Sequence, residues 1–164
     1  MIVNTENKKV KNATECVHDG IKFKSELEGN VYVLLKSAGF KPDYEKKVFH
    51  VWRGKKFLTP CYDLHKDRKL KKNVWGINNY KPVDIKYKPD FTFFITDSSG
   101  ADRMIIVEAK GYPNDRYAYV KKMFRSLLER DYPGSVFFEV HNQKQAKAAI
   151  EIIKSLNNDR KEFI

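Results

Sequence analysis

Several features that would narrow the function are scarce or missing in this chain of 164 residues. Only two cysteines occur, Cys16 and Cys61, which are too few for a disulfide framework or a four-ligand zinc site. No segment approaches the run of about 20 apolar residues that a membrane-spanning helix needs. The first 20 residues also lack the apolar stretch of a secretory signal. We therefore expect a soluble cytoplasmic protein in a reducing compartment, without contact to a membrane.

Internal repeats and low-complexity tracts are also missing, and the length is that of one domain with a real hydrophobic core. Residues 1–24 are polar with weak periodicity, so we expect an N-terminal arm there. Residues 25–164 are expected to form a single domain. A basic insert of about residues 52–81 interrupts it and resembles an elaborated hairpin or loop.

Acidic residues are in the minority, with 21 Asp and Glu against 32 Lys and Arg, and the net charge is +11. The segment from Lys41 to Lys88 holds 14 basic and 5 acidic residues, so +9 of this charge lies within it. Such an excess indicates a polyanionic partner, although a solvated charged face is the simpler alternative. Within the segment, residues 66–72 read KDRKLKK and precede Trp75 and Tyr80, which combines phosphate-neutralising charge with aromatic surface. The side chains predicted to contact nucleic acid are Lys66, Arg68, Lys69, Lys71, Lys72, Arg116, Lys121 and Lys122.

Apolar periodicity predicts a chain that alternates helices and strands. A helix should begin at Ser25 and stop at Gly39, and strand-like stretches follow it. After a central hairpin come a helix, a short apolar run with the composition of an interior strand, and a last amphipathic helix. The strand, helix, strand unit over 104–140 should be parallel, which predicts a mixed sheet with helices packed on it. The expected elements are helix 25–38, strands 41–51 and 57–62, hairpin 88–111, helix 117–130, strand 135–140 and helix 146–156.

The central hairpin, KPDFTFFITDSSGADRMIIVEAKG from Lys88 to Gly111, is the stretch around which the chain is organised. Two strand-like runs flank a polar turn at residues 97–102. If the runs pair about Ser99, Asp90 lies opposite Glu108, and like charges in that position destabilise a sheet. A divalent cation would offset the repulsion. The period of two along a strand brings Lys110 to the same face as Glu108.

Glu28 allows two interpretations. Ser25 and Glu28 fit a capping box, in which the glutamate reaches back to the start of its helix. However, Glu28 also projects near the border of the buried stripe of that helix, from where a carboxylate can reach a metal ion. The four histidines are scattered along the chain, and we expect a structural or surface role for each. The alternative for His141, which directly follows an apolar strand-like run, is a contact with the substrate.

These residue types suit the hydrolysis of phosphodiesters. The reaction needs charge stabilisation on phosphoryl oxygens and an activated water, and one or two Mg²⁺ or Mn²⁺ ions held by carboxylates supply both. Asp90 and Glu108 would be ligands, and the backbone carbonyl of Ala109 is a possible third. Lys110 could orient or deprotonate the water. The alternative is that Glu108 and Lys110 form an exposed ion pair of little energetic value.

The combination of Lys-Pro-Asp90, Glu108-Ala-Lys110-Gly111 and Glu28 on a preceding helix resembles the PD-(D/E)xK nuclease superfamily. Within it the chain is most similar to small phage nucleases of the endonuclease I type, which cut branched DNA. The resemblance implies a restriction-endonuclease-like α/β fold, a mixed central sheet flanked by helices. It also implies that Glu28, Asp90 and Glu108 bind the metal and that Lys110 is the catalytic lysine.

The function expected on this basis is a Mg²⁺-dependent endonuclease for DNA. The resemblance suggests branched DNA as the substrate, in the manner of Holliday junction resolvases, in phage or mobile-element recombination. A junction needs two coordinated cuts, so we expect a homodimer. Two departures leave the substrate open, since the gap between Asp90 and Glu108 is longer than in the endonuclease I type and the basic insert has no counterpart there. Alternatives are a restriction-like or repair nuclease, or a non-catalytic nucleic-acid-binding protein.

Overall fold

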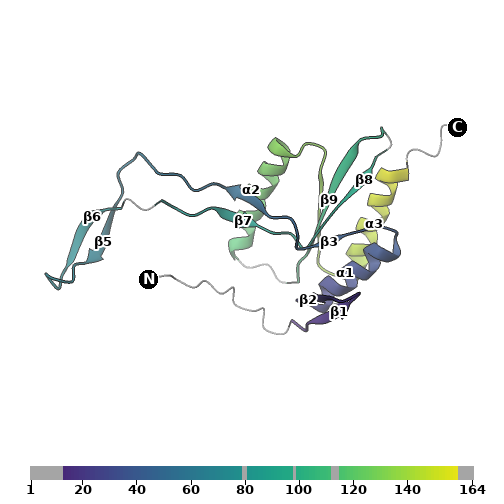
Figure 1. Cartoon of the computed structure of the whole chain (residues 1–164), viewed down its shortest axis with the longest axis horizontal. Coiled ribbons are helices and arrows are strands. Elements are labelled where there is room, and N and C mark those ends of the chain that lie inside the picture. The colour runs from purple at the N-terminus through teal and green to yellow at the C-terminus, as the bar shows by residue number, and fades with distance from the viewer. Residues whose placement is uncertain (1–12, 79–80, 98, 112–114, 159–164) are drawn as a thin grey trace.

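A computed structural model describes residues 13–78, 81–97, 99–111 and 115–158 of the chain, and these form a mixed α/β fold (Figure 1). Within these ranges there are three helices, one four-stranded mixed sheet and three two-stranded hairpins or pairs. The mixed sheet with packed helices that the sequence predicts is thus confirmed. The helices are α1 (Glu26–Ser37), α2 (Asp115–Asp131) and α3 (Gln143–Asn158).

The four-stranded sheet has the order β10 (Val136–Val140), β9 (Asp102–Ala109), β8 (Phe91–Thr96) and β3 (Asp43–Tyr44). Its centre is the β8–β9 hairpin, whose antiparallel register runs from Phe91 opposite Val107 to Thr96 opposite Asp102. Continued by one residue, this register sets Asp90 across from Glu108. The predicted register is therefore confirmed.

The turn chemistry explains why the register of β8 and β9 is fixed. The Oδ1 atom of Asp97 accepts hydrogen bonds from the amides of Ser99 and Ala101, at 2.9 and 3.1 Å. Gly100 has a φ of 88°, a conformation that glycine adopts without strain. A slip of one residue would turn every apolar side chain of a strand to the wrong face of the sheet. The defined turn and the burial of these side chains therefore both favour the observed register.

Strand β10 pairs parallel to β9, with Glu139 aligned to Glu108, which confirms the predicted parallel unit. The prediction of an interior strand is wrong, because β10 is at an edge of the sheet. Its continuous apolar run has another cause. Val136 and Phe138 pack on one side of the sheet and Phe137 packs on the other, so helices cover both faces.

The helices lie on opposite faces of the sheet, and this divides the core in two (Figure 1). On one side α1 and α3 pack against residues such as Phe91, Ile105 and Val107, which are at most 2% exposed. On the other side α2 packs against Met104 and Ile106 together with the pair β4 (Phe49–Trp52) and β7 (Ile85–Tyr87). The even-numbered positions of β9 therefore face α2, and Glu108 belongs to this set.

Helix α1 starts and ends where the sequence predicts. The Ser25 hydroxyl caps it by accepting a hydrogen bond from the Glu28 amide at 3.2 Å. Gly39 follows its last turn with a φ of 90°. The reciprocal half of the capping box differs from the expected one, because the Glu28 carboxylate accepts from the amide of Lys24 at 3.1 Å rather than from that of Ser25.

Three predictions about the flanking segments need correction. The region predicted as an arm contains the hairpin β1 (Cys16–His18) and β2 (Ile21–Phe23), and Phe23 is fully buried in the core. The arm's residues 1–12 lie outside the described part. The strand predicted at 41–51 is split into β3 and β4, which belong to different sheets, and the strand predicted at 57–62 begins only at Tyr62.

The basic insert contains a β-ribbon, as the hairpin interpretation predicts. Strands β5 (Tyr62–Lys66) and β6 (Asn73–Ile77) pair antiparallel and project well away from the sheet and helices (Figure 1). In the part of the chain that the structure describes, no helix is long and apolar enough to cross a membrane.

Candidate active site at the ends of strands β8 and β9

Asp90 and Glu108 occupy the end of the β8–β9 pair that is opposite the turn. Asp90 precedes the first residue of β8, and its Oδ2 atom accepts a hydrogen bond from the Ala109 amide at 2.7 Å. Glu108 is 6% exposed, and its Oε2 atom accepts a hydrogen bond from the Tyr87 hydroxyl at 2.8 Å. The two carboxyl groups that the sequence predicts to meet are therefore held beside each other by neighbouring backbone and side-chain donors.

The electrostatics of this pair are unfavourable to two negative charges. Burial raises the pKa of Asp90 well above its ordinary value, and the charges of Glu108 and Glu28 raise it further. Burial also raises the pKa of Glu108, although the hydrogen bond from Tyr87 and the charge of Lys110 oppose the rise. Neighbouring carboxyl groups with raised pKa values are typical of functional sites, since a bound cation relieves their repulsion.

Lys110 lies at the same end of β9, as its spacing from Glu108 predicts. Its Nζ atom is 3.8 Å from the Oε1 atom of Glu108 and 4.6 Å from the centre of the Tyr117 ring on α2. Its side chain is 26% exposed, so the ammonium group is neither fully solvated nor sealed in the core. The amine can thus reach a group bound at Glu108 while the aromatic ring limits its movement.

Glu28 lies in the first turn of α1, and its carboxylate is occupied by local partners. The Oε2 atom accepts from the Tyr44 hydroxyl at 2.5 Å, and the Oε1 atom accepts from the Ser25 hydroxyl at 2.9 Å. Only 8% of the residue is exposed. The negative charge of Glu28 nonetheless contributes to the raised pKa of Asp90. The hydrogen bonds of Glu28 favour the capping interpretation. Its effect on the pKa of Asp90 favours the interpretation as a metal ligand.

Two further carboxylates next to the site were not predicted. Glu139 aligns with Glu108 in the parallel register and contacts the Tyr117 hydroxyl at 2.5 Å, Lys121 at 2.7 Å and His141 at 3.1 Å. Although burial raises the pKa of Glu139, the hydrogen bonds from Lys121 and Tyr117 outweigh this and hold it below its ordinary value. The signal in the sequence was a single glutamate inside the apolar run of β10.

Glu45 is the second unpredicted carboxylate, and it follows β3. Its amide donates to the Asp90 carbonyl at 2.7 Å, and its side chain pairs with Lys24 and with Lys88, the latter at 2.9 Å. Burial raises the pKa of Glu45, but the hydrogen bonds from the two lysines lower it below its ordinary value. Nothing in the local sequence distinguishes Glu45 from the other charged residues of the basic segment.

The tyrosines that support the carboxylates come from three different elements. Tyr44, Tyr87 and Tyr117 donate to Glu28, Glu108 and Glu139, respectively. Burial raises the pKa of each phenol, and the adjacent carboxylate raises it further, so all three remain protonated donors. Each carboxylate is thereby fixed in orientation, which preorganises the site.

Within the described ranges, no three His, Cys, Asp or Glu side chains form a group that could hold a metal ion by themselves. The register sets Asp90 and Glu108 side by side. That these two carboxylates bind a metal ion stays a prediction, as does the contribution of Glu28 and of the Ala109 carbonyl. Tyr112, which follows Gly111 and by its position in the sequence would line the site, lies outside the described residues.

The predicted nucleic-acid contacts fall into two groups. One surrounds the turn of the β5–β6 ribbon, where Lys66, Arg68, Lys69, Lys71 and Lys72 are all exposed. The other is on α2, where Arg116 and Lys122 are exposed. Lys121 differs from the other α2 residues, because it pairs with Glu139 and thus belongs to the surroundings of the carboxylate site.

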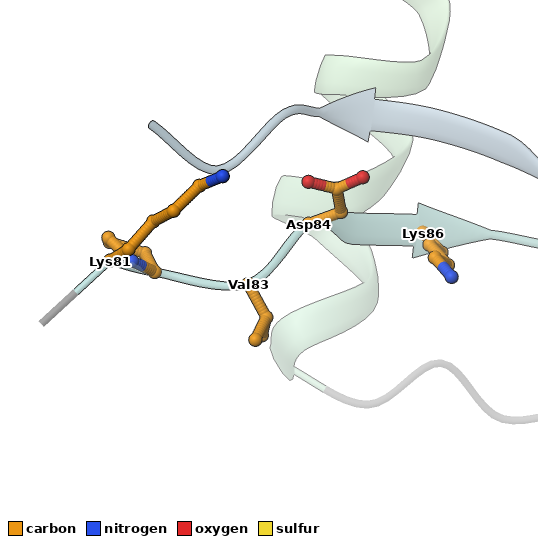
Figure 2. A pocket seen from close by; sticks show the side chains of 5 residues that line it. Lys81, Val83, Asp84 and Lys86 are labelled. Atoms are coloured by element: carbon orange, nitrogen blue, oxygen red, sulfur yellow. The ribbon is translucent and has the colours of Figure 1, made fainter. Parts of the chain in front are cut away.

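A surface hollow of about 570 Å³ lies elsewhere, at the base of the ribbon, and is lined by Lys81, Pro82, Val83, Asp84 and Lys86 (Figure 2). None of these residues belongs to the carboxylate site.

Comparisons with protein-family models, with curated proteins and with solved structures found no match for this chain.

Proposed function

We propose that the protein is a metal-dependent endonuclease that hydrolyses phosphodiester bonds in DNA. The observation that carries this proposal is the placement of Asp90 and Glu108 across the β8–β9 pair, with the Lys110 ammonium group 3.8 Å from Glu108. The order α1, β3, β8, β9, α2, β10 also supports a restriction-endonuclease-like core, since the PD-(D/E)xK superfamily has a helix, three strands, a helix and a strand in its core.

The residues present fit a divalent cation. Asp90 and Glu108 offer hard oxygen ligands. Burial raises the pKa of both carboxyl groups, and a bound cation would offset this cost of ionisation. The ion, when bound, would stabilise charge on the phosphoryl oxygens and lower the pKa of a water. Glu28 would complete the set of carboxylates, as the resemblance implies.

The remaining residues of the site would position substrate and water. Lys110 would donate to the scissile phosphate or hold the attacking water near Glu108. Tyr87 and Tyr117 would fix the Glu108 carboxylate and the Lys110 amine by the contacts described above. The exposed lysines and arginines of the ribbon and α2 would bind the phosphate backbone, largely without regard to sequence. Branched DNA and a homodimer are the finer parts of this proposal.

A non-catalytic nucleic-acid-binding protein is the second candidate, and one observation favours it. Both carboxylate oxygens of Glu28 accept hydrogen bonds at the start of α1, which is sufficient to explain its burial. Calorimetric titration with Mg²⁺ separates the candidates. The nuclease should bind the ion and lose this binding in Asp90→Asn. DNA binding without any Mg²⁺ binding would favour the second candidate.

A further inference from the structure

The β5–β6 ribbon has one apolar face that nothing else in the described chain covers. In its register Tyr62 faces Ile77 and Leu64 faces Trp75. Facing residues in an antiparallel pair project to the same side, so these four side chains share one face. They are 58%, 55%, 52% and 69% exposed in the order given. A contiguous exposed group of large apolar side chains marks an interaction site.

The opposite face of the ribbon is different in character. Asp63 lies opposite Gly76, and His65 lies opposite Val74. A Cβ atom on Gly76 would be 2.4 Å from Cε1 of His65, so the imidazole ring lies directly on the glycine backbone. The ribbon thus has one apolar and one mainly polar face, and only the apolar face offers a broad surface of aromatic and aliphatic side chains.

The turn of the ribbon carries the charge. Asp67 orders it, because its Oδ1 atom accepts hydrogen bonds from the amides of Lys69 and Leu70, both at 2.8 Å. Lys71 has a positive φ of 50°, which closes the turn. Four exposed basic residues lie in this turn, and the exposed Lys66 ends β5 beside it; the four are Arg68, Lys69, Lys71 and Lys72. This charge makes a polyanion the fitting occupant and disfavours a second copy of the chain, whose turn carries the same charge.

The two segments that lead to and from the ribbon contact each other where they leave β4 and β7. Asp84, just before β7, accepts from His50 at 2.6 Å and from the Gly54 amide at 2.8 Å. Figure 2 shows its carboxylate directed toward the segment that follows β4. A Cβ atom on Gly54 would be 1.8 Å from the Pro82 carbonyl oxygen, so the two connecting segments run in close contact. These contacts define the place on the core from which the insert departs.

We propose that the Tyr62, Leu64, Trp75 and Ile77 face of the ribbon stacks on unpaired bases of the DNA while the basic turn binds the adjacent phosphates. This inference rests on the proposed function in taking DNA as the partner. Duplex DNA suits the face poorly, because base edges in the major groove present donors and acceptors that apolar side chains would leave unpaired. The faces of unpaired bases, by contrast, stack on aromatic side chains whatever their sequence. The substrate would thus be DNA with unpaired bases, in a single strand or at a branch.

The first test measures binding in EDTA, so that its result is independent of cleavage. The full chain is titrated against a labelled single-stranded DNA and against the duplex of the same sequence. Trp75→Ala should weaken binding of the single strand by about 5- to 150-fold and affect the duplex far less. Phe94→Ala, which removes an aromatic ring of 62% exposure on β8, should change neither. Equal weakening of both DNAs by Trp75→Ala, no weakening, or no DNA binding by the wild type would overturn the proposal.

The second test leaves the ribbon intact. The chain has two tryptophans, so Trp52→Phe makes Trp75 the only one, and stacked bases should quench its fluorescence. Unchanged fluorescence at saturating single-stranded DNA would contradict stacking. Light scattering decides about a second copy: a dimer that Trp75→Ala converts to a monomer would assign the face to self-association instead. Failure of the proposed function is recognised separately, as lack of cleavage with Mg²⁺ while these binding results hold.

Discussion

The Oδ2 atom of Asp90 accepts a hydrogen bond from the Ala109 amide at 2.7 Å, which joins the first carboxylate of the candidate site to the strand that carries the second. This bond holds Asp90 beside Glu108 although burial and charge repulsion oppose ionisation of both. The fold therefore keeps two carboxyl groups together at a cost to its own stability. Such a conflict is expected where a site has a function to perform.

Removal of one charge should stabilise the protein. Asp90→Asn retains an acceptor for the Ala109 amide and ends the repulsion, so the free energy of unfolding should rise by about 0.5 to 2 kcal/mol at neutral pH without divalent cations. The folded-state pKa of Asp90 lies above its ordinary value. The wild type therefore loses stability as the pH rises from the ordinary value through the raised one. Urea denaturation at about pH 4 and about pH 8 should show a larger advantage of the variant at the higher pH.

Asp102→Asn is the control for this measurement, since Asp102 is an exposed aspartate at the other end of the same strand pair. It should show no such pH-dependent gain. An Asp90→Asn variant that is less stable than the wild type at both pH values would contradict the electrostatic account of the site.

Glu28 can be tested for its two roles at once. Glu28→Gln preserves the shape and most of the hydrogen bonds at the start of α1, so the free energy of unfolding should change by less than about 1 kcal/mol. Cleavage should fall by at least about tenfold if the carboxylate helps to bind the metal. Glu26→Gln removes a similar charge from an exposed position in the same turn and should leave cleavage unaltered. Full activity of Glu28→Gln would assign the residue to the helix cap alone.

Lys110 should act in the reaction rather than in binding. Lys110→Ala removes the amine near Glu108 and should lower the single-turnover cleavage rate by about 10² to 10⁴, with DNA affinity within a few-fold of the wild type. Lys122→Ala, on the exposed side of α2, should show the opposite pattern of weaker binding and an unchanged rate at saturating protein. A fully active Lys110→Ala variant would remove the lysine from the mechanism.

The basic turn of the ribbon should contribute to the salt dependence of binding. Each phosphate contact to duplex DNA adds about 0.9 to the slope of log K against log salt. The double variant Lys71→Ala with Lys72→Ala should therefore reduce the slope by about 2. The charge-matched variant Lys144→Ala with Lys147→Ala, on α3, should keep the slope of the wild type. Equal slopes for both double variants would show that the turn does not bind phosphates.

The part of the site that lies within one hairpin could be predicted from the sequence. The turn between β8 and β9 sets Asp90 opposite Glu108, and the two-residue period of a strand brings Lys110 to the same side as Glu108. The turn residues Asp97 and Gly100 fix the register of this pairing. The ends of helix α1 could also be predicted, because Ser25 and Gly39 are local signals for the start and the stop of a helix. The turn and the helix ends form as these local residues predict, because the tertiary contacts of the fold agree with the same local conformations.

The supporting residues could not be predicted, because their partners come from distant segments. Tyr87 and Tyr117 meet Glu108 and Glu139 only after α2 and β7 have packed on the same face of the sheet. The edge position of β10 also depends on distant segments, because helices on both faces of the sheet bury its apolar side chains. A continuous apolar run indicates that both faces of a strand are buried. Helices packed on the sheet can bury both faces of an edge strand, so the run does not show whether a strand is central.

The most direct test of the central claim is a cleavage assay with a panel of DNA substrates. Four-way junctions, duplexes and single strands are incubated with the protein and Mg²⁺ or Mn²⁺, and Asp90→Asn is assayed in parallel. We predict metal-dependent cutting of at least one substrate, most rapid on DNA with a branch or unpaired bases, and its loss in Asp90→Asn. Absence of cleavage on every DNA with either metal ion, or equal cleavage by Asp90→Asn, would contradict the account.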